Sequence, residues 1–421
     1  MRRPALLLAC LLASSAWAQD RGPVIDMHLH AYPLDLPPGS PACAGDQPIT
    51  VPTMDPRDEF DPSLLGNCPQ PMRAPATEDA LMRESLAALR RHDVRRAITD
   101  GSVERVARWR AQAPGVIVPA VAFGKRQDKS IEELRALHRA GQLAAFAEVS
   151  IQYRGLRADD PRFAPYFALA EELDIPVGIH LGEGPPGAAR FPGYEDYRAS
   201  MTTPFQLEEV LRRHPKLRIW VMHYASPLVD EMIAMMFTHP NLYVDVSCNN
   251  WGFPRAQFHD ALKRMVDAGF GKRILFGSDQ MYWPDAIGEA IKAIDTAPFL
   301  SPGQKRDIFY NNAARFLRLS EAEFADLVSE AQLSMGTMSA ETMERGDDTV
   351  EPFDPEAGPK PETDSGANKK KPKSKRQSRQ ERLAAEAKEL ERLEKRQENN
   401  PNILKYPAKT IYKAVKHPSV V

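Results

Sequence analysis

Two histidines separated by one residue end the first apolar segment of the chain. The segment reads V-I-D-M-H-L-H, and its histidines are His28 and His30. Residues two apart in a β-strand point to the same face of a sheet, so the two imidazoles would lie side by side. Two adjacent imidazoles can supply half of a metal site. An H-x-H pair alone is a weak motif, and its meaning depends on what other segments bring beside it.

Four further residues that can bind a metal ion stand at the ends of later apolar segments. Glu148 ends A-F-A-E, His180 ends V-G-I-H, His223 ends I-W-V-M-H and Asp279 ends I-L-F-G-S-D. Imidazoles and carboxylates suit a divalent cation, Zn²⁺ first, with Mn²⁺ and Fe²⁺ as alternatives. Such a cation lowers the pKa of a bound water, and a neighbouring carboxylate can accept the proton.

Two kinds of segment alternate between residues 23 and 320. Short β-branched runs predict strands at 23–29, 94–100, 116–123, 143–150, 175–181, 217–223, 241–247 and 272–278. Longer patterns predict helices at 77–92, 102–112, 130–140, 161–173, 204–214, 227–238, 255–268 and 284–296, with a further helix at 302–318. Eight strands each followed by a helix indicate an α/β fold of the (β/α)8 TIM barrel type, with a doubly wound open sheet as the alternative.

The barrel explains why distant residues would meet. All of its parallel strands direct their C-terminal ends to one rim, so the candidate ligands at the strand ends converge there. Basic residues in loops at the same rim are candidates to hold a substrate carboxylate, although they could equally be surface charges. These residues are Lys125, Arg126, Arg154 and Arg190.

A proline-rich insertion, residues 31–76, follows the first predicted strand and therefore lies over the mouth of the barrel. It either forms part of the wall of the substrate-binding site or is a surface loop that is held by a cross-link. Cys43 and Cys68 both fall within it and can form a disulfide in an oxidising compartment, with two free thiols as the alternative.

The N-terminus predicts export. Arg2 and Arg3 precede a short apolar run, and A-W-A precedes Gln19. This pattern predicts a signal peptide over residues 1–18, cleaved after Ala18, and therefore a periplasmic or secreted protein. No other segment is long and apolar enough to cross a membrane.

The predicted catalytic domain covers residues 19–335, and a polar tail covers residues 336–421. The tail is partly disordered by composition, with a short charged helix over 377–398. It is also basic, since residues 367–421 hold 16 Lys and Arg against 6 Asp and Glu. The rest of the chain is acidic, so no specific nucleic-acid partner is expected.

As a set, these motifs resemble the amidohydrolase superfamily, and most closely its amidohydrolase-related branch of TIM-barrel metal-dependent hydrolases. The resemblance covers about residues 23–320. It implies that His28, His30, His180 and Asp279 bind the catalytic metal and that Asp279 doubles as the general base. It also implies that His223 polarises the scissile group or binds a second metal.

Glu148 stands where members of the superfamily carry a carboxylated lysine or a glutamate, so a carboxylated lysine is not expected in this chain. The resemblance leaves open whether Glu148 bridges two metals or contacts the metal ligands without binding a metal itself.

The resemblance implies a metal-dependent hydrolase that cleaves an ester, lactone, amide or related bond of a small-molecule substrate with one or two divalent ions. A decarboxylase of the same branch, acting on an aromatic or enol carboxylic acid, is the first alternative. A nuclease resembling the TatD-type deoxyribonucleases and a binding protein without activity are the others. A homo-oligomer is compatible with all of these interpretations.

Overall fold

The structure is a computed structural model that describes residues 22–49, 55, 57, 67–124, 128–190, 194–320 and 323. The predicted signal peptide, the tail from residue 336 onward and part of the insertion lie outside the described residues. Those predictions are therefore untested. Within the described part, no helix combines the length and the apolar character needed to cross a membrane.

Eight parallel strands form the centre of the domain, one for each predicted strand. They are β1 (Val24–Ala31), β4 (Val94–Gly101), β5 (Ile117–Pro119), β6 (Phe146–Val149), β7 (Val177–His180), β8 (Ile219–Met222), β9 (Leu242–Asp245) and β10 (Ile274–Leu275). Strands β1, β4 and β5 form one sheet, and β6 to β10 form another. Bridges between Ala120 and Ala145 and between Leu29 and Gln280 join the two sheets at both seams. The strands thus form a closed ring, as the barrel prediction requires.

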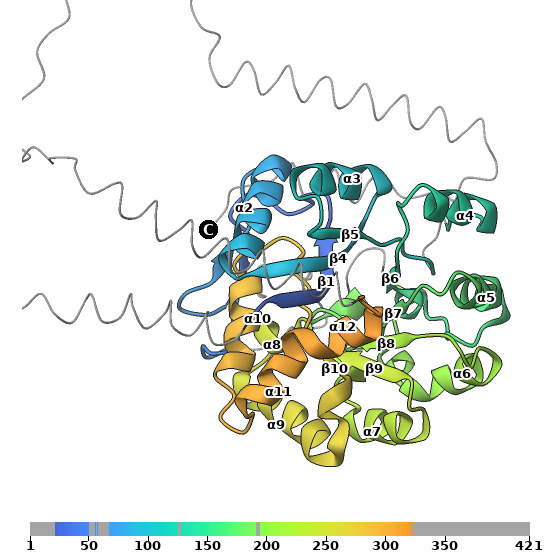
Figure 1. The fold of residues 1–421 in the computed structure, drawn as a ribbon. Helices are drawn as coiled ribbons and strands as arrows, with labels where there is room; N and C mark the ends of the chain where they lie inside the picture. The colour runs from blue at the N-terminus through green and yellow to red at the C-terminus, as the bar shows by residue number, and fades with distance from the viewer. Residues whose placement is uncertain are drawn as a thin grey trace, which may run out of the picture. The chain divides into compact units, whose positions relative to one another are not determined.

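Helices surround this ring of strands (Figure 1). They are α2 (Glu78–Arg91), α3 (Val103–Gln112), α4 (Ile131–Arg139), α5 (Ala164–Glu172), α6 (Glu208–Arg213), α7 (Val229–Thr238), α9 (Arg255–Met265) and α10 (Ala286–Asp295). Each lies within or overlaps a predicted helix. The predicted helix at 302–318 is broken into α11 (Pro302–Arg306) and α12 (Asn312–Leu317) by a π-helical turn. The short α8 (Asn249–Gly252) was not predicted, because four residues carry no periodic pattern.

A large aromatic side chain fills the barrel near its N-terminal end. Trp220 on β8 is fully buried, and a Cβ atom at Gly178 on β7 would lie 2.3 Å from its ring. Glycine is therefore required at that position. Phe316 of α12 packs edge-on against Trp220 with ring centroids 5.7 Å apart. This packing closes the N-terminal end of the barrel and leaves the C-terminal rim as the place for a site.

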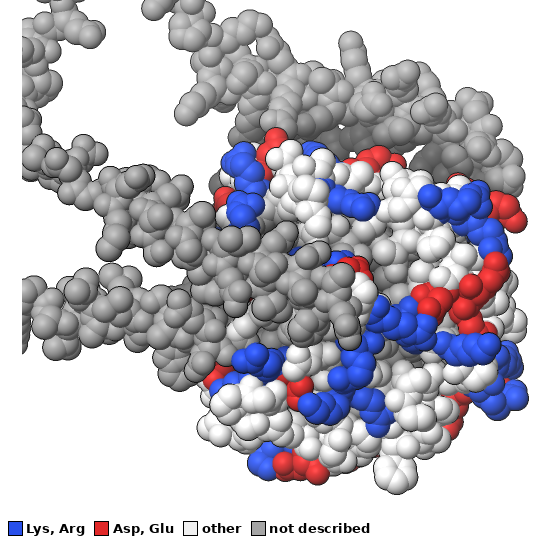
Figure 2. All heavy atoms as spheres, viewed as in Figure 1, with Lys and Arg blue, Asp and Glu red and all other residues white. Residues whose placement is uncertain are grey.

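Charged side chains of both signs are interspersed on the face of the domain drawn in Figure 2. Many of them pair with each other, as Arg135 does with Glu172 and Arg212 with Glu209. Exposed pairs of this kind contribute little to stability, and they break up any large field of one sign.

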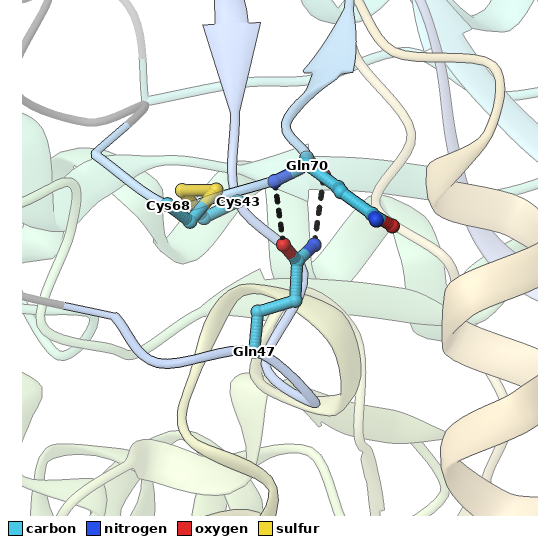
Figure 3. Close-up of a disulfide and its surroundings, with 4 residues drawn as sticks. All are labelled: Cys43, Gln47, Cys68 and Gln70. Atoms are coloured by element: carbon cyan, nitrogen blue, oxygen red, sulfur yellow. Dashed lines mark hydrogen bonds between the residues drawn. A yellow bond between two sulfur atoms is a disulfide. The ribbon is translucent and has the colours of Figure 1, made fainter.

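The proline-rich insertion is held together by the predicted disulfide, which the structure confirms between Cys43 and Cys68 (Figure 3). Strands β2 (Pro41–Ala42) and β3 (Met72–Arg73) pair antiparallel beside it. The side chain of Gln47 also donates to the carbonyl of Gln70 and accepts from its backbone N–H, at 2.7 and 2.8 Å.

The insertion is anchored on the loops that follow β9 and β10. The backbone N–H of Gly45 donates to the carbonyl of Trp251, and the N–H of Arg255 donates back to the carbonyl of Gly45. The indole of Trp283 donates to the carbonyl of Ser40 at 2.9 Å. Since these loops follow strand C-termini, the described part of the insertion lies at the mouth of the barrel, as predicted.

Replacing Cys43 and Cys68 with serine should lower the free energy of unfolding by about 2–4 kcal/mol, because the cross-link restricts the unfolded chain. The two residues are 25 apart in sequence. Urea unfolding followed by circular dichroism measures the change. A reductant should destabilise the wild type by a similar amount and leave the double variant unaffected. Equal midpoints for the wild type and the double variant would refute this role of the disulfide.

Candidate metal centre

The six candidate residues meet at the C-terminal rim of the barrel. His28 and His30 lie on β1, Glu148 on β6 and His180 at the end of β7, while His223 directly follows β8 and Asp279 lies in the loop after β10. All six are buried, and the most exposed of them, Glu148, shows only 8% of its surface. Buried groups of this polarity need partners, so the cluster is not a set of solvated surface residues.

Glu148 is the common neighbour of the four histidines. Its Oε1 lies 4.0, 3.8 and 3.6 Å from the Nε2 atoms of His28, His180 and His223, and its Oε2 lies 3.9 Å from Nε2 of His30. The donor atoms of His28, His30 and Glu148 all lie within 4.8 Å of one another, and so do those of Glu148, His180 and His223. The carboxylate therefore belongs to two adjoining groups of metal-binding atoms.

Asp279 faces the H-x-H pair across the seam between β10 and β1. Its Oδ1 lies 2.8 Å from Nε2 of His30 and 3.5 Å from Nε2 of His28. The F-G-S-D segment is fixed against β1, because the N–H of Asp279 donates to the carbonyl of His28 at 2.7 Å. A Cβ atom at Gly277 would lie 2.9 Å from Cβ of His28, so this glycine permits the close approach.

On β1, the outer nitrogen of each histidine faces a hydrogen-bond acceptor. Nδ1 of His28 lies 2.7 Å from Oγ of Ser247, whose hydroxyl donates to Asp245, and Nδ1 of His30 is hydrogen-bonded to the carboxylate of Asp100. Both rings therefore carry hydrogen on Nδ1 and direct Nε2 into the site.

The histidine at the end of β7 and the one that follows β8 also have an acceptor beside Nδ1. Nδ1 of His223 lies 3.1 Å from the carbonyl of Ser247, and Nδ1 of His180 lies 3.0 Å from Oε1 of Gln152. The orientation of the Gln152 amide is fixed, since its nitrogen donates to the carbonyl of Gly182 and its oxygen accepts the N–H of the same residue. Oε1 can only accept, so Nδ1 of His180 is the donor.

The electrostatics of the cluster also fit a cation. Burial lowers the pKa of His180 to about 3, so this ring is neutral. Burial acts in the same direction on His223, but the hydrogen bond with Glu148 and the charges of Asp279 and Asp245 raise its pKa to about 9. Burial therefore decides the charge of His180, whereas the neighbouring carboxylates decide that of His223.

The residues present fit a divalent metal ion. Nε2 of His28 is buried and has no hydrogen-bond partner among the residues that the structure describes. It points toward Glu148 and Asp279, which supply oxygen ligands beside imidazole nitrogens. A cation there would satisfy the orphaned lone pair and compensate the buried carboxylates.

Two of the site residues sit on strained backbone. His223 has φ 62° and Asp279 has φ 51°, both in the left-handed region that non-glycine residues rarely adopt. Each such position costs of order 1–3 kcal/mol and persists only when its surroundings hold it. The carboxylate of Asp245 accepts the N–H of His223 at 3.0 Å and is part of that support.

Sequence reasoning missed the residues that hold the histidines. Asp100 ends the predicted strand 94–100, so the strand-end rule could have found it. Asp245 ends the observed β9, two residues before the end of the predicted strand 241–247. Ser247 lies two residues beyond Asp245. No sequence pattern pointed to Gln152, because it lies in a 3₁₀ turn (Ile151–Arg154) after β6.

The predicted basic residues of the rim are only partly described. The half-buried Arg154 contributes to the lowered pKa of Asp160, although Arg162 is the main cause. Arg190 is exposed at the end of a 3₁₀ turn. Lys125 and Arg126 lie outside the described residues. The structure thus brings the six metal-site candidates together.

The chain belongs to the amidohydrolase family, since the family model described as amidohydrolase matches residues 25–319. The match covers the barrel from β1 to the end of α12. Among curated proteins, none matches the chain.

Three solved structures illustrate what the chain is similar to. An uncharacterized TIM-barrel protein from Bordetella bronchiseptica shares 22% identity with a TM-score of 0.44, covering 56% of this chain and 81% of that one. The 5-carboxyvanillate decarboxylase from Sphingomonas paucimobilis shares 18%, with a TM-score of 0.42 and coverage of 56% and 82%. A probable 2-pyrone-4,6-dicarboxylic acid hydrolase from Acinetobacter baumannii shares 14%, with a TM-score of 0.46 and coverage of 70% and 99%. None is similar enough to transfer its reaction.

Replacing His28 and His30 together with alanine should abolish metal binding, because two of the converging Nε2 atoms are removed. Mass spectrometry of the purified protein for metals, with atoms counted per chain, measures this. The matched control is His138→Ala, since His138 lies on α4 and bonds to the carbonyl of Leu143. Retention of stoichiometric metal by the double variant would disprove the site assignment.

Proposed function

We propose that this member of the amidohydrolase family is a metal-dependent hydrolase that cleaves an ester, lactone, amide or related bond of a small molecule. The observation that carries the proposal is the convergence of four Nε2 atoms on Glu148 and Asp279 at the mouth of the barrel. A divalent ion, Zn²⁺ first with Mn²⁺ or Fe²⁺ as alternatives, would supply an activated water and polarise the scissile group.

Five residues would hold the ion or ions: His28, His30, Glu148, His180 and Asp279. Glu148 is shared by two groups of donor atoms, which supports a bridging role if two ions bind. With one ion, the H-x-H pair and Asp279 would remain the nearest set. The number of metal atoms per chain distinguishes these cases.

Two residues would act on the substrate and the attacking water. The carboxylate of Asp279 would take the proton from the water and later pass it to the leaving group. His223, whose raised pKa keeps its ring protonated in the metal-free site, would donate from Nε2 to the oxygen of the scissile group. Its Nδ1 is held by the carbonyl of Ser247, so Nε2 is the nitrogen left to act.

Decarboxylation of an aromatic or enol acid is the second candidate, and the walls of the site favour it. The ring of Tyr32 stacks on His30 with centroids 4.2 Å apart, and the ring of Tyr153 lies 4.7 Å from that of His180. Tyr194 continues this wall, 4.9 Å from Tyr153. A flat aromatic substrate would pack well against such rings.

Assays of the metal-loaded enzyme on lactones and esters, and on aromatic and enol carboxylic acids, should show hydrolysis without release of CO₂. Asp279→Asn should lower kcat by about 10²–10⁴-fold, the usual contribution of a general base. Asp267→Asn is the control, because Asp267 is exposed on the surface and pairs with Lys263 there. Release of CO₂ from an acid without hydrolysis of any ester or lactone would establish the second candidate instead.

We also propose that the enzyme works in the periplasm or outside the cell. The signal-like pattern over residues 1–18 supports export, and a disulfide between Cys43 and Cys68 suits an oxidising compartment. Intact-mass analysis of the protein recovered from the native or a related host should give a mature N-terminus at Gln19. A protein that keeps its N-terminal residues and stays in the cytoplasm would contradict the proposal.

A further inference from the structure

Tyr153 stands directly beside a histidine of the metal centre. It lies in the 3₁₀ turn after β6 and is half-buried. Its hydroxyl is 3.2 Å from Nε2 of His180, and its ring is 4.7 Å from the imidazole. The rings of Tyr194 and Tyr197, 4.9 and 5.3 Å away, hold the ring of Tyr153 in place.

The direction of this hydrogen bond follows from the partners of His180. Gln152 accepts from Nδ1, so Nε2 of the neutral ring carries a lone pair and can only accept. A tyrosine phenol keeps its proton at neutral pH. The phenol of Tyr153 is therefore the donor and His180 the acceptor.

The proposed function creates a competition for that lone pair. Nε2 of His180 cannot bind a cation and accept a hydrogen bond from Tyr153 at the same time, because it has one lone pair. A phenol that loses its acceptor in a desolvated site pays a penalty unless another acceptor replaces it. The oxygen of a bound substrate at the mouth of the barrel can supply that acceptor.

Tyr32 provides a contrast within the same site. Its hydroxyl donates to Oε2 of Glu148 at 3.5 Å. A carboxylate oxygen has a second lone pair and can accept a hydrogen bond while it binds a metal. Tyr32 would thus keep its acceptor when the site is loaded, and only Tyr153 would lose the one seen in the structure.

We propose that Tyr153 is a catalytic hydrogen-bond donor that binds the substrate oxygen on which negative charge develops. The inference rests on the proposed metal-dependent function. It holds for a carbonyl oxygen in hydrolysis and for a carboxylate oxygen in decarboxylation, since both gain from a fixed neutral donor. The hydroxyl of Tyr153 would then donate to His180 when the site holds no metal, and to the substrate when the metal is bound.

The test compares Tyr153→Phe with the wild type in two binding measurements. Zn²⁺ affinity, measured by competition with a chromophoric chelator, should be unchanged or tighter in the variant, because no hydrogen bond to His180 must be broken. Binding of phenylphosphonate to the Zn²⁺-loaded protein, measured by calorimetry, should weaken about tenfold or more, since a hydrogen bond to a charged group is lost.

Tyr166→Phe is the matched control. It removes the same hydroxyl from α5, where the phenol donates to the carbonyl of Lys129, and should change neither measurement. With a hydrolysed ester in hand, Tyr153→Phe should lower kcat with little change in KM, as expected for an interaction made in the transition state.

Each other outcome has a definite meaning. Weaker Zn²⁺ binding by Tyr153→Phe would show that the phenol positions His180 or binds the metal, and would overturn the inference. Unchanged phenylphosphonate affinity would also overturn it, while leaving the metal-dependent function standing. A wild-type protein that binds no Zn²⁺, Mn²⁺ or Fe²⁺ would refute the proposed function and, with it, this role of Tyr153.

Discussion

The site depends on one repeated interaction, the hydrogen bond at the outer nitrogen of each histidine. Asp100, Ser247 and Gln152 occupy the Nδ1 atoms of His30, His28 and His180. A ring whose Nδ1 donates directs Nε2 into the site, and it cannot turn without breaking a buried bond. Four rings held in this way, His223 by the carbonyl of Ser247, surround Glu148 and are oriented for a cation before any ion arrives.

The barrel supplies these partners through strand pairing. His30 and Asp100 are register partners in the parallel pair of β1 and β4, so the carboxylate is placed by the sheet itself. Asp245 and Ser247 come from the end of β9, and their side chains support residues of β1 and β8. The same backbone that closes the ring therefore positions the side chains at its rim. The strained backbone of His223 is held by its N–H bond to Asp245, and that of Asp279 by its N–H bond to the carbonyl of His28.

The sequence predicted the strands, the helices and the six converging residues, because each rests on a local signal. Apolar runs mark β1 and β4 to β10, and a polar residue at the end of a run marks the rim. The same rule could have found Asp100, but that its carboxylate faces Nδ1 of His30 depends on strand register. No local signal pointed to Gln152, which lies in an irregular turn. No sequence signal showed that glycine is required at Gly178 and Gly277, because the requirement comes from Trp220 and His28 on neighbouring strands.

The insertion and the loops form the wall of the site where a substrate would bind, which the strands do not. The sequence left open whether residues 31–76 form a cross-linked surface loop or a wall of the site. The described part of this insertion is cross-linked and also contributes to the wall. The disulfide and the hydrogen bonds of Gly45 anchor it, while Tyr32 at its start stacks on His30 and reaches Glu148. Tyr153 and Tyr194, from the loops after β6 and β7, complete an aromatic wall. Four of the six metal-site candidates lie on strands and the other two follow β8 and β10. Since the wall comes from the loops, changes in the loops can alter the substrate while the candidate metal site stays the same.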